Sequence, residues 1–261
     1  MLKKIIYLIV SGGLLLSGCS LDYEPLNGPS SGSFPASEEE AMAGLYAAYK
    51  GLANMTVKET PFPMRINDCI SDIGTYRTGA GNQIKAMSST LTADNTMCEK
   101  VYKTVYKIAG RVHLVLDNLD RLRGVIPEDR FNQIKAELLC IRAYYYDLGC
   151  QFYGDIPFSE AFQGRNNVLK PKFDTQKEVY TQLFADLERA NSLYDPSRAL
   201  RYPNKDLMYK GDIAKWRKFT NSLHMRLLMR LQNRIAEKPE FPHEIGIFLG
   251  YPLEDVDGFI T

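Results

Sequence analysis

The sequence predicts an all-α protein, and three observations carry that prediction. Apolar residues recur at helical spacing in successive long segments between residues 37 and 237. Capping-box pairs stand at the start of such segments, as in Ser37 with Glu40 and Thr175 with Glu178. No segment shows the clean alternation of a half-buried strand. We therefore expect helices packed on helices.

The N-terminus predicts a lipoprotein signal over residues 1–18. Lys3 and Lys4 precede an apolar run, Ile5 to Leu16, that is shorter than the ~20 residues of a membrane-spanning helix. The run ends in Leu-Ser-Gly-Cys, which resembles the lipobox of bacterial lipoproteins and predicts acylation of Cys19. Several acyl chains anchor a protein stably where one chain is marginal. The alternative is an ordinary signal peptide with a chance cysteine.

Residues 19–36 are rich in Ser, Gly and Pro and predict a flexible tether. The tether contains Gly28-Pro-Ser-Ser-Gly32, a match to the Gly-x-Ser-x-Gly motif of serine hydrolases. That motif needs a strand before it and a helix after it. Since more tether flanks it on both sides, we interpret the match as chance.

The helical segments follow in order along the chain. The helix opened by Ser37 precedes a long loop, from about Thr56 to Thr92. From Asn95 a helix is expected to run to Leu122, because apolar residues keep helical spacing that far. Pro127 suits the start of the next helix, and Gly154 and Pro157 its end. Further helices are expected after the caps Thr175 and Asp212.

The helix after Pro127 is apolar on more than one side. Its main seam runs at spacings of three and four through Phe131, Ile134, Leu138, Ile141, Tyr145, Leu148 and Phe152. Tyr144 and Tyr146 flank this seam, with their hydroxyls expected to stay half wet. Such a helix is sandwiched between neighbours, as in stacked helix pairs. Cys140 and Cys150, ~15 Å apart on this helix, cannot pair and are expected to be buried thiols.

The segment AELLCIRAYYYDLGCQFYGDIPFSEAF, residues 136–162, resembles the signature of the SusD/RagB family. Supporting matches are the lipobox, EEEAMAGLYAAY, TQKEVYTQLFADLERA and GDIAKWRKFTNSLHMRLLMR, in family order. The resemblance implies tetratricopeptide-like stacked helix pairs with long loops. It also implies a non-enzymatic outer-membrane lipoprotein of the Bacteroidetes type, exposed at the cell surface. Such proteins capture a nutrient, commonly an oligosaccharide, and pass it to a TonB-dependent, SusC-like transporter.

The end of the chain departs from the family pattern. Family members continue with a second, loop-rich half, so the helical domain, residues 37–237, is expected to be incomplete. Residues 238–261 include FPHEIGIFLGYPLEDVDGFI, which resembles a segment of a small uncharacterised bacterial family. A foreign tail joined near Lys238 and a divergent terminus are both open. One alternative to a binding function is therefore that the chain is a truncated, non-functional fragment.

The expected ligand site lies on the long loop before Thr92. Glycan binding needs exposed aromatic rings beside planar amides and carboxylates that pair with hydroxyl groups. In the family, the corresponding loop often carries ligand contacts. The candidate ligand-binding residues are Asp72, Tyr76, Arg77, Asn82 and Gln83. The alternative for Tyr76 is a packed ring.

Other function classes have weaker support in the sequence. The histidines His113, His224 and His243 lack metal-ligand spacing, so no metal or cofactor is expected. Without the signal the net charge falls from +1 to −1, which gives no global reason to expect nucleic acid. Arg226, Arg230 and Arg234 form a row that we interpret as a solvated stripe. A hydrolase and a peptide-docking helical scaffold remain the rival classes.

Overall fold

The computed structural model describes residues 34–57, 92, 96–198 and 206–235 of the 261-residue chain. The chain divides into two compact units, Met1–Phe34 and Pro35–Thr261. All the helices described below belong to the second unit. The tail, residues 238–261, lies outside the described residues, and so does nearly all of the signal and tether. The domain boundaries therefore stay predictions.

Helices make up the regular structure of the second unit. Their order is α2 (Glu38–Val57), α5 (Thr96–Leu116), η1 (Leu119–Leu122), α6 (Glu128–Tyr153), η2 (Gly164–Asn166), α7 (Gln176–Leu193) and α8 (Ile213–Ile235). Within the described part the only β-type pairings are isolated bridges, Arg123 with Ile126 and Ile156 with Asp174. The all-α prediction is confirmed.

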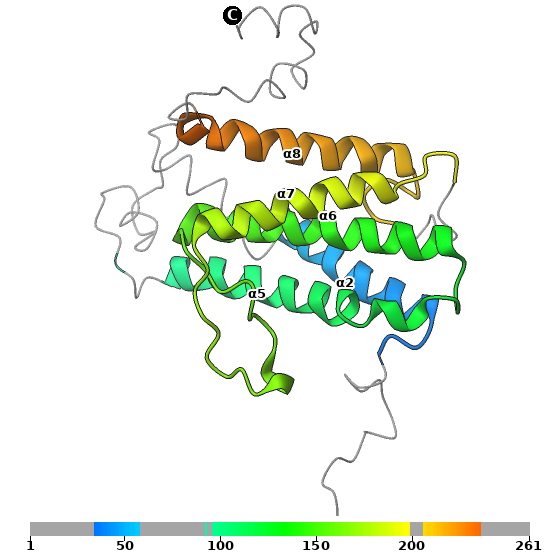
Figure 1. Ribbon diagram of the computed structural model, residues 1–261, viewed down its shortest axis with the longest axis horizontal. Coiled ribbons are helices and arrows are strands. Elements are labelled where there is room, and N and C mark those ends of the chain that lie inside the picture. The colour runs from blue at the N-terminus through cyan, green and yellow to red at the C-terminus, as the bar shows by residue number, and fades with distance from the viewer. Residues whose placement is uncertain (1–33, 58–91, 93–95, 199–205, 236–261) are drawn as a thin grey trace, which may run out of the picture. The chain divides into compact units, whose positions relative to one another are not determined.

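The helices pack as successive neighbours in stacked layers (Figure 1). α2 packs against α5, α6 lies between α5 and α7, and α8 covers α7 and part of α6. α6 and α7 run antiparallel, because contacts from Arg142 and Cys150 of α6 reach Asp186 and Gln176 of α7 in reverse order. This is the stacked-pair arrangement that the apolar faces require.

The helix ends mostly follow the capping signals. Thr175 accepts from the Glu178 backbone N–H, and the Glu178 side chain accepts from the Thr175 N–H in return. Gly154 ends α6 at φ +71°, a left-handed conformation that glycine adopts at little cost. Ser37 accepts from the Glu40 N–H, but Glu40 bonds the Ala36 N–H instead of closing the expected box.

The helix expected to run from Asn95 to Leu122 ends earlier. α5 stops at Leu116, and η1 carries the last apolar residues, Leu119 and Leu122, both 1% exposed. The side chain of Asn118 donates to the Leu114 carbonyl (2.9 Å), which competes with the backbone pattern of a helix. The apolar spacing therefore predicted correctly that Leu119 and Leu122 are buried, but the α-helix does not continue as far as these residues.

The three tyrosines of α6 occupy different environments. Tyr145 and Tyr146 are fully buried, so the expectation of a half-wet Tyr146 is wrong. The Tyr146 hydroxyl lies 3.3 Å from His113 Nε2, and its ring packs on Phe158. Tyr144 is half-buried and lies near Phe219 of α8. α6 is thus enclosed by α5 on one side and by α7 and α8 on the other, as its sequence predicts.

The arginine row of α8 is not the solvated stripe that we expected. Arg226 and Arg230 bind the carboxylate of Asp147, which lies fully buried on α6, at 3.2 and 2.8 Å. The side chain of Arg234 lies outside the described residues. The partner was hidden in the sequence because it lies on another helix, far along the chain.

Cys140 and Cys150 are buried and unpaired, as predicted. Burial raises the pKa of each thiol to about 12, so both stay protonated at neutral pH.

Candidate functional site

The site residues predicted from the sequence lie outside the described residues. These are Asp72, Tyr76, Arg77, Asn82 and Gln83, together with the lipidation residue Cys19. Their roles stay predictions. The described residues offer a different group of side chains, at the start of α5 and the end of α6.

Five aromatic side chains gather there in what we name the aromatic cluster: Tyr102, Tyr106, Phe152, Tyr153 and Phe162. The ring centroids of Tyr102 and Tyr106 are 4.5 Å apart, and Tyr153 meets Tyr102 edge-on at 5.3 Å. The tyrosines and Phe152 are half-buried, and Phe162 is 44% exposed. The cluster therefore presents ring surface to solvent.

The helices bring these rings together by simple spacing. Tyr102 and Tyr106 are four residues apart on α5, so both lie on one face of that helix. Phe152 and Tyr153 lie in the last turn of α6. Beneath them is an apolar floor of Val101, Val105 and Leu148. The floor fixes the rings from below and leaves their edges accessible.

Tyr106 ties α5 to the loop that follows α6. Its hydroxyl donates to the Pro157 carbonyl oxygen at 2.8 Å. Burial, and then the neighbouring Tyr102, raise the pKa of the Tyr106 phenol above its usual value. The phenol is therefore a neutral donor throughout the physiological range.

Phe162 is held in a strained conformation. Its φ of 62° is left-handed, which is rare for a bulky residue and costs ~1–3 kcal/mol. Its ring lies over Gly110 of α5, where an added Cβ would come within 2.9 Å of Cε1. His113 lies 5.1 Å from it, centroid to centroid. The glycine thus makes room for the ring, and the packing of that ring offsets the backbone strain.

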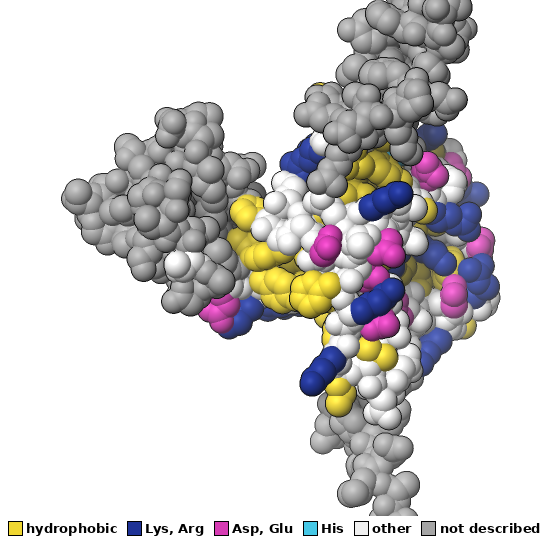
Figure 2. All heavy atoms as spheres, turned by 60° about the vertical axis from the view of Figure 1, so that its left-hand side comes forward, with side chains coloured by type: hydrophobic (Ala, Val, Ile, Leu, Met, Phe, Trp, Pro, Cys, Tyr) yellow, Lys and Arg dark blue, Asp and Glu magenta, His cyan; other side chains and the backbone are white. Residues whose placement is uncertain are grey.

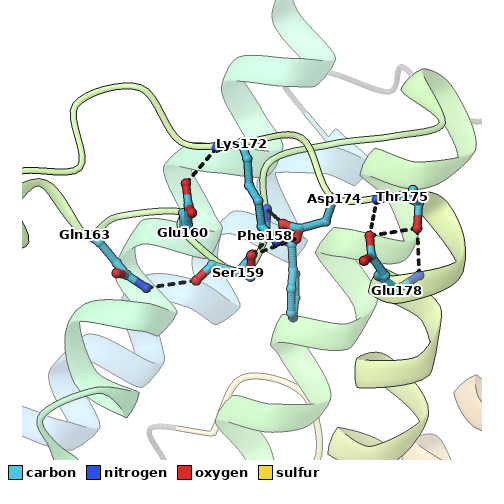
Figure 3. Close-up of polar contacts among 8 residues, drawn as sticks. All are labelled: Phe158, Ser159, Glu160, Gln163, Lys172, Asp174, Thr175 and Glu178. Carbon is cyan, nitrogen blue, oxygen red and sulfur yellow. Dashed lines mark hydrogen bonds and ion pairs between the residues drawn. The ribbon is translucent and has the colours of Figure 1, made fainter.

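A buried carboxylate organises the loop between α6 and α7 (Figure 3). Asp174 accepts from the backbone N–H groups of Phe158 (3.0 Å) and Ser159 (2.7 Å), and from the Ser159 hydroxyl (2.7 Å). Although burial opposes its charge, these donors and Lys172 lower the pKa of Asp174. Asp174 also pairs with Ile156 through backbone hydrogen bonds at 3.1 and 3.0 Å. The base of the loop is therefore closed.

Charged and polar side chains border the aromatic cluster. Glu99 and Lys103 form an ion pair in the first turns of α5, on either side of Tyr102 in the sequence. Lys103 lowers the pKa of the exposed Glu99 through this pairing. Gln163, next to Phe162, donates to the Ser159 carbonyl oxygen at 2.8 Å. Figure 2, which turns this end of the helices forward, shows an apolar patch with charged side chains beside it.

The cluster suits binding more than bond cleavage. Aromatic faces can stack on an apolar ligand surface, and nearby carboxylate, ammonium and amide groups can pair with hydroxyls. Across the described residues, no group of His, Cys, Asp and Glu side chains is arranged to hold a metal ion. Of the helices in the described part, none is long and apolar enough to cross a bilayer.

Of these five rings, only Phe152 stood out in the sequence, as the last residue of the apolar seam of α6. The four-residue spacing of Tyr102 and Tyr106 was visible, but it also fits an ordinary buried helix face. No sequence pattern indicated a role for Phe162, because its ring is positioned by Gly110 of α5, which lies far from it along the chain. Only the fold brings the cluster together.

Comparisons with known proteins give one family and a set of structures. A model of the SusD-like family described as "Starch-binding associating with outer membrane" matches residues 45–247, more than half of the chain. The match extends into the segment 238–261 that we expected to be atypical. A search of curated proteins found no match.

Among solved structures, surface glycan-binding protein A from Bacteroides fluxus is similar at 24% identity and a TM-score of 0.59, over 78% of this chain and 42% of that one. A SusD/RagB family protein from Bacteroides thetaiotaomicron is similar at 22% identity and 0.56, over 74% and 39%. A SusD-like protein from Bacteroides fragilis is similar at 16% identity and 0.59, over 88% and 42%. The present chain thus spans about two fifths of the length of these structures, which share its fold.

Proposed function

Because the chain belongs to the SusD-like family, we propose that it is a cell-surface lipoprotein that binds glycans and works with a TonB-dependent outer-membrane transporter. The observation that carries the proposal is the family match over residues 45–247. The family description, starch binding in association with the outer membrane, supports glycan binding at the outer membrane. The surface glycan-binding protein from Bacteroides fluxus, with the same fold, supports it.

We assign glycan contact in the described part to the aromatic cluster. A sugar ring has an apolar face that can stack on Tyr102 or Tyr153, while its hydroxyls can pair with Glu99 and Lys103. The segment carrying Tyr76 leads directly into α5, whose second turn holds Tyr102. Tyr76, Asn82 and Gln83 are proposed as further ligand contacts from that segment.

The proposed role is capture without turnover. Glycosidases need two carboxyl groups at defined separations across the bond that they cleave. The aromatic cluster instead has an exposed ion pair at its edge, in which Lys103 already neutralises Glu99. We therefore expect bound oligosaccharides to be recovered intact.

Anchoring is proposed through Cys19. Labelled palmitate should enter the wild type in a bacterial host and should be absent from Cys19→Ala. Equal labelling of the two proteins would refute the anchor and leave the glycan proposal standing.

The binding function is tested on a glycan array. We expect the wild type to bind at least one class of oligosaccharide, with affinity in the ~mM to ~µM range, equivalent to −4 to −8 kcal/mol. Tyr102→Ala should lose this binding while keeping the helical circular dichroism of the wild type. A folded wild type that binds no glycan on the array would overturn the proposal.

A further inference from the structure

Two arginines of α8 carry more positive charge than their shared partner neutralises. Arg226 and Arg230, which we name the arginine pair, bind the buried carboxylate of Asp147 on α6 at 3.2 and 2.8 Å. α8 contains six basic residues and no acidic one, so no carboxylate on the same helix balances the second arginine. One net positive charge (two minus one) therefore remains, on side chains that are 43% and 36% exposed.

Asp147 has no acceptor position left for the remaining donors of the arginine pair. The two oxygens of a carboxylate offer about four lone-pair positions. Five contacts already converge on them, two from Arg230 and one each from Arg226, Tyr180 and Gln151. Arg226 uses only Nη2 and Arg230 only Nη1, so two nitrogens of each guanidinium group have no partner among the described residues. Their N–H groups can bind a second anion.

The guanidinium group of Arg226 is held in position from two sides. The carboxylate of Asp147 fixes one edge, and the face of the guanidinium lies over the half-buried ring of Tyr144, with its carbon 5.3 Å from the ring centroid. Tyr144 in turn packs near Phe219 of α8, with 6.4 Å between the ring centroids. An arginine that is already ordered loses less conformational entropy on binding a ligand than an unrestrained surface arginine does.

The arginine pair lies near the same end of α6 as the aromatic cluster. Asp147 precedes Tyr153 by six residues (153 minus 147), which is ~9 Å along the helix axis. Asp147 contacts α8, whereas Tyr153 contacts Tyr102 of α5. The exposed Gln151, which donates to Asp147, lies between them on α6. An oligosaccharide on the rings would therefore have the arginine pair within reach of its neighbouring sugar units.

We propose that the arginine pair binds a carboxylate or sulfate group carried by the glycan, so that the ligand is an acidic oligosaccharide. The planar guanidinium presents two parallel N–H groups to the oxygens of such an anion. The ring of Tyr144 beside it can contact the apolar face of the same sugar unit. The inference rests on the proposed function and names its class of ligand. A free inorganic anion has the same chemistry, and the experiment separates the two sources.

The test is an NMR titration of the full chain, followed at the Nε–H signals of Arg226 and Arg230. The probes are glucuronate, galacturonate and glucose 6-sulfate, with glucose and galactose as neutral controls and sodium sulfate as the free anion. At matched ionic strength, at least one acidic sugar should shift both signals saturably. It should bind at least ~10-fold more tightly than sodium sulfate, and the neutral sugars should leave both signals unchanged.

Two variants test the geometry, and both leave Arg230 to neutralise Asp147. Arg226→Lys keeps the positive charge but loses the planar fork, and Arg226→Ala loses both. Each should weaken acidic-sugar binding at least ~10-fold at the Arg230 signal, with the circular dichroism of the wild type. The matched control is Lys218→Ala, which removes an exposed charge from the same helix and should bind as the wild type does.

Three results would overturn the inference. The first is that no acidic sugar shifts the two signals, and the second is that sodium sulfate binds as tightly as the acidic sugars. The third is that Arg226→Ala and Lys218→Ala weaken binding equally, which would indicate a general effect of charge. If neutral oligosaccharides bind on the glycan array while no acidic sugar binds at the arginine pair, the inference fails and the proposed function stands.

Discussion

Removing the Asp147 carboxylate should destabilise the fold strongly, because three helices meet at it. The side chain of Asp147, on α6, is 0% exposed and accepts from the Tyr180 hydroxyl of α7 at 3.0 Å. Arg230 of α8 reaches both of its oxygens, at 3.0 and 2.8 Å, and Arg226 one of them at 3.2 Å. The exposed side chain of Gln151, one turn along α6, also donates to Asp147 at 2.8 Å. Asp147→Ala leaves all four donors without this acceptor.

The expected loss in the free energy of unfolding depends on whether each donor can form a hydrogen bond with water in place of Asp147. Tyr180 is 5% exposed, so its hydroxyl would lose a hydrogen bond in the interior, at ~1–3 kcal/mol. The side chains of Arg226 and Arg230 are 43% and 36% exposed and would partly recover water. The free energy of unfolding lost at these two arginines therefore stays below the ~3–5 kcal/mol that is lost when a fully buried ion pair is broken. We expect a total of about 3 kcal/mol.

The measurement is urea unfolding followed by the fluorescence of Trp216. Asp147→Ala should lower the midpoint clearly, and Arg230→Ala should lower it less, because Arg226 still neutralises the carboxylate. The exposed Lys218→Ala on the same helix should stay within about 0.5 kcal/mol of the wild type. A cost for Asp147→Ala no larger than that of Lys218→Ala would refute the network.

Three other variants test the core. Burial, and then the nearby Asp206 carboxylate, raise the pKa of Glu137 well above its ordinary value. The wild type therefore loses stability as pH rises above about 4.5, so Glu137→Gln should be the more stable protein at pH 7 and its equal at pH 4. Equal urea midpoints for the wild type and Glu137→Gln at pH 7 would contradict the raised pKa of Glu137. Leu138→Ala, at 0% exposure, should cost ~2–5 kcal/mol in urea unfolding, and a cost under ~1 kcal/mol would mean that the seam is misplaced. Gly51→Ala should lower the melting temperature, although alanine favours helices by ~1 kcal/mol, because its Cβ would come within 2.0 Å of Ile108 Cδ1. A raised melting temperature would show that α2 and α5 are not in this close contact.

The sequence predicted those parts of the fold that depend on local spacing. The seam through Leu138 and Tyr145 is buried, and the Thr175 cap forms both of its bonds, since each signal spans only a few residues. The early end of α5 was missed because Asn118 competes for a backbone carbonyl, which apolar spacing does not report.

Features that join distant segments could not be predicted in this way. The Arg226 row looked solvated because its partner, Asp147, is separated from it by 79 residues. The aromatic cluster likewise needs Tyr102, Tyr153 and Phe162 from separate elements. The family resemblance supplied the expectation of glycan binding, and the fold supplied the rings for it.

The most direct test of the central claim is calorimetry with an oligosaccharide that binds on the array. The wild type should show saturable binding, and Tyr102→Ala should weaken it at least ~10-fold, equivalent to a loss of ~1.4 kcal/mol. Phe173→Ala, which removes a 65% exposed ring from the loop between α6 and α7, is the matched control and should bind as the wild type does. Unchanged affinity in Tyr102→Ala, with that protein folded, would contradict the assignment of glycan binding to the aromatic cluster.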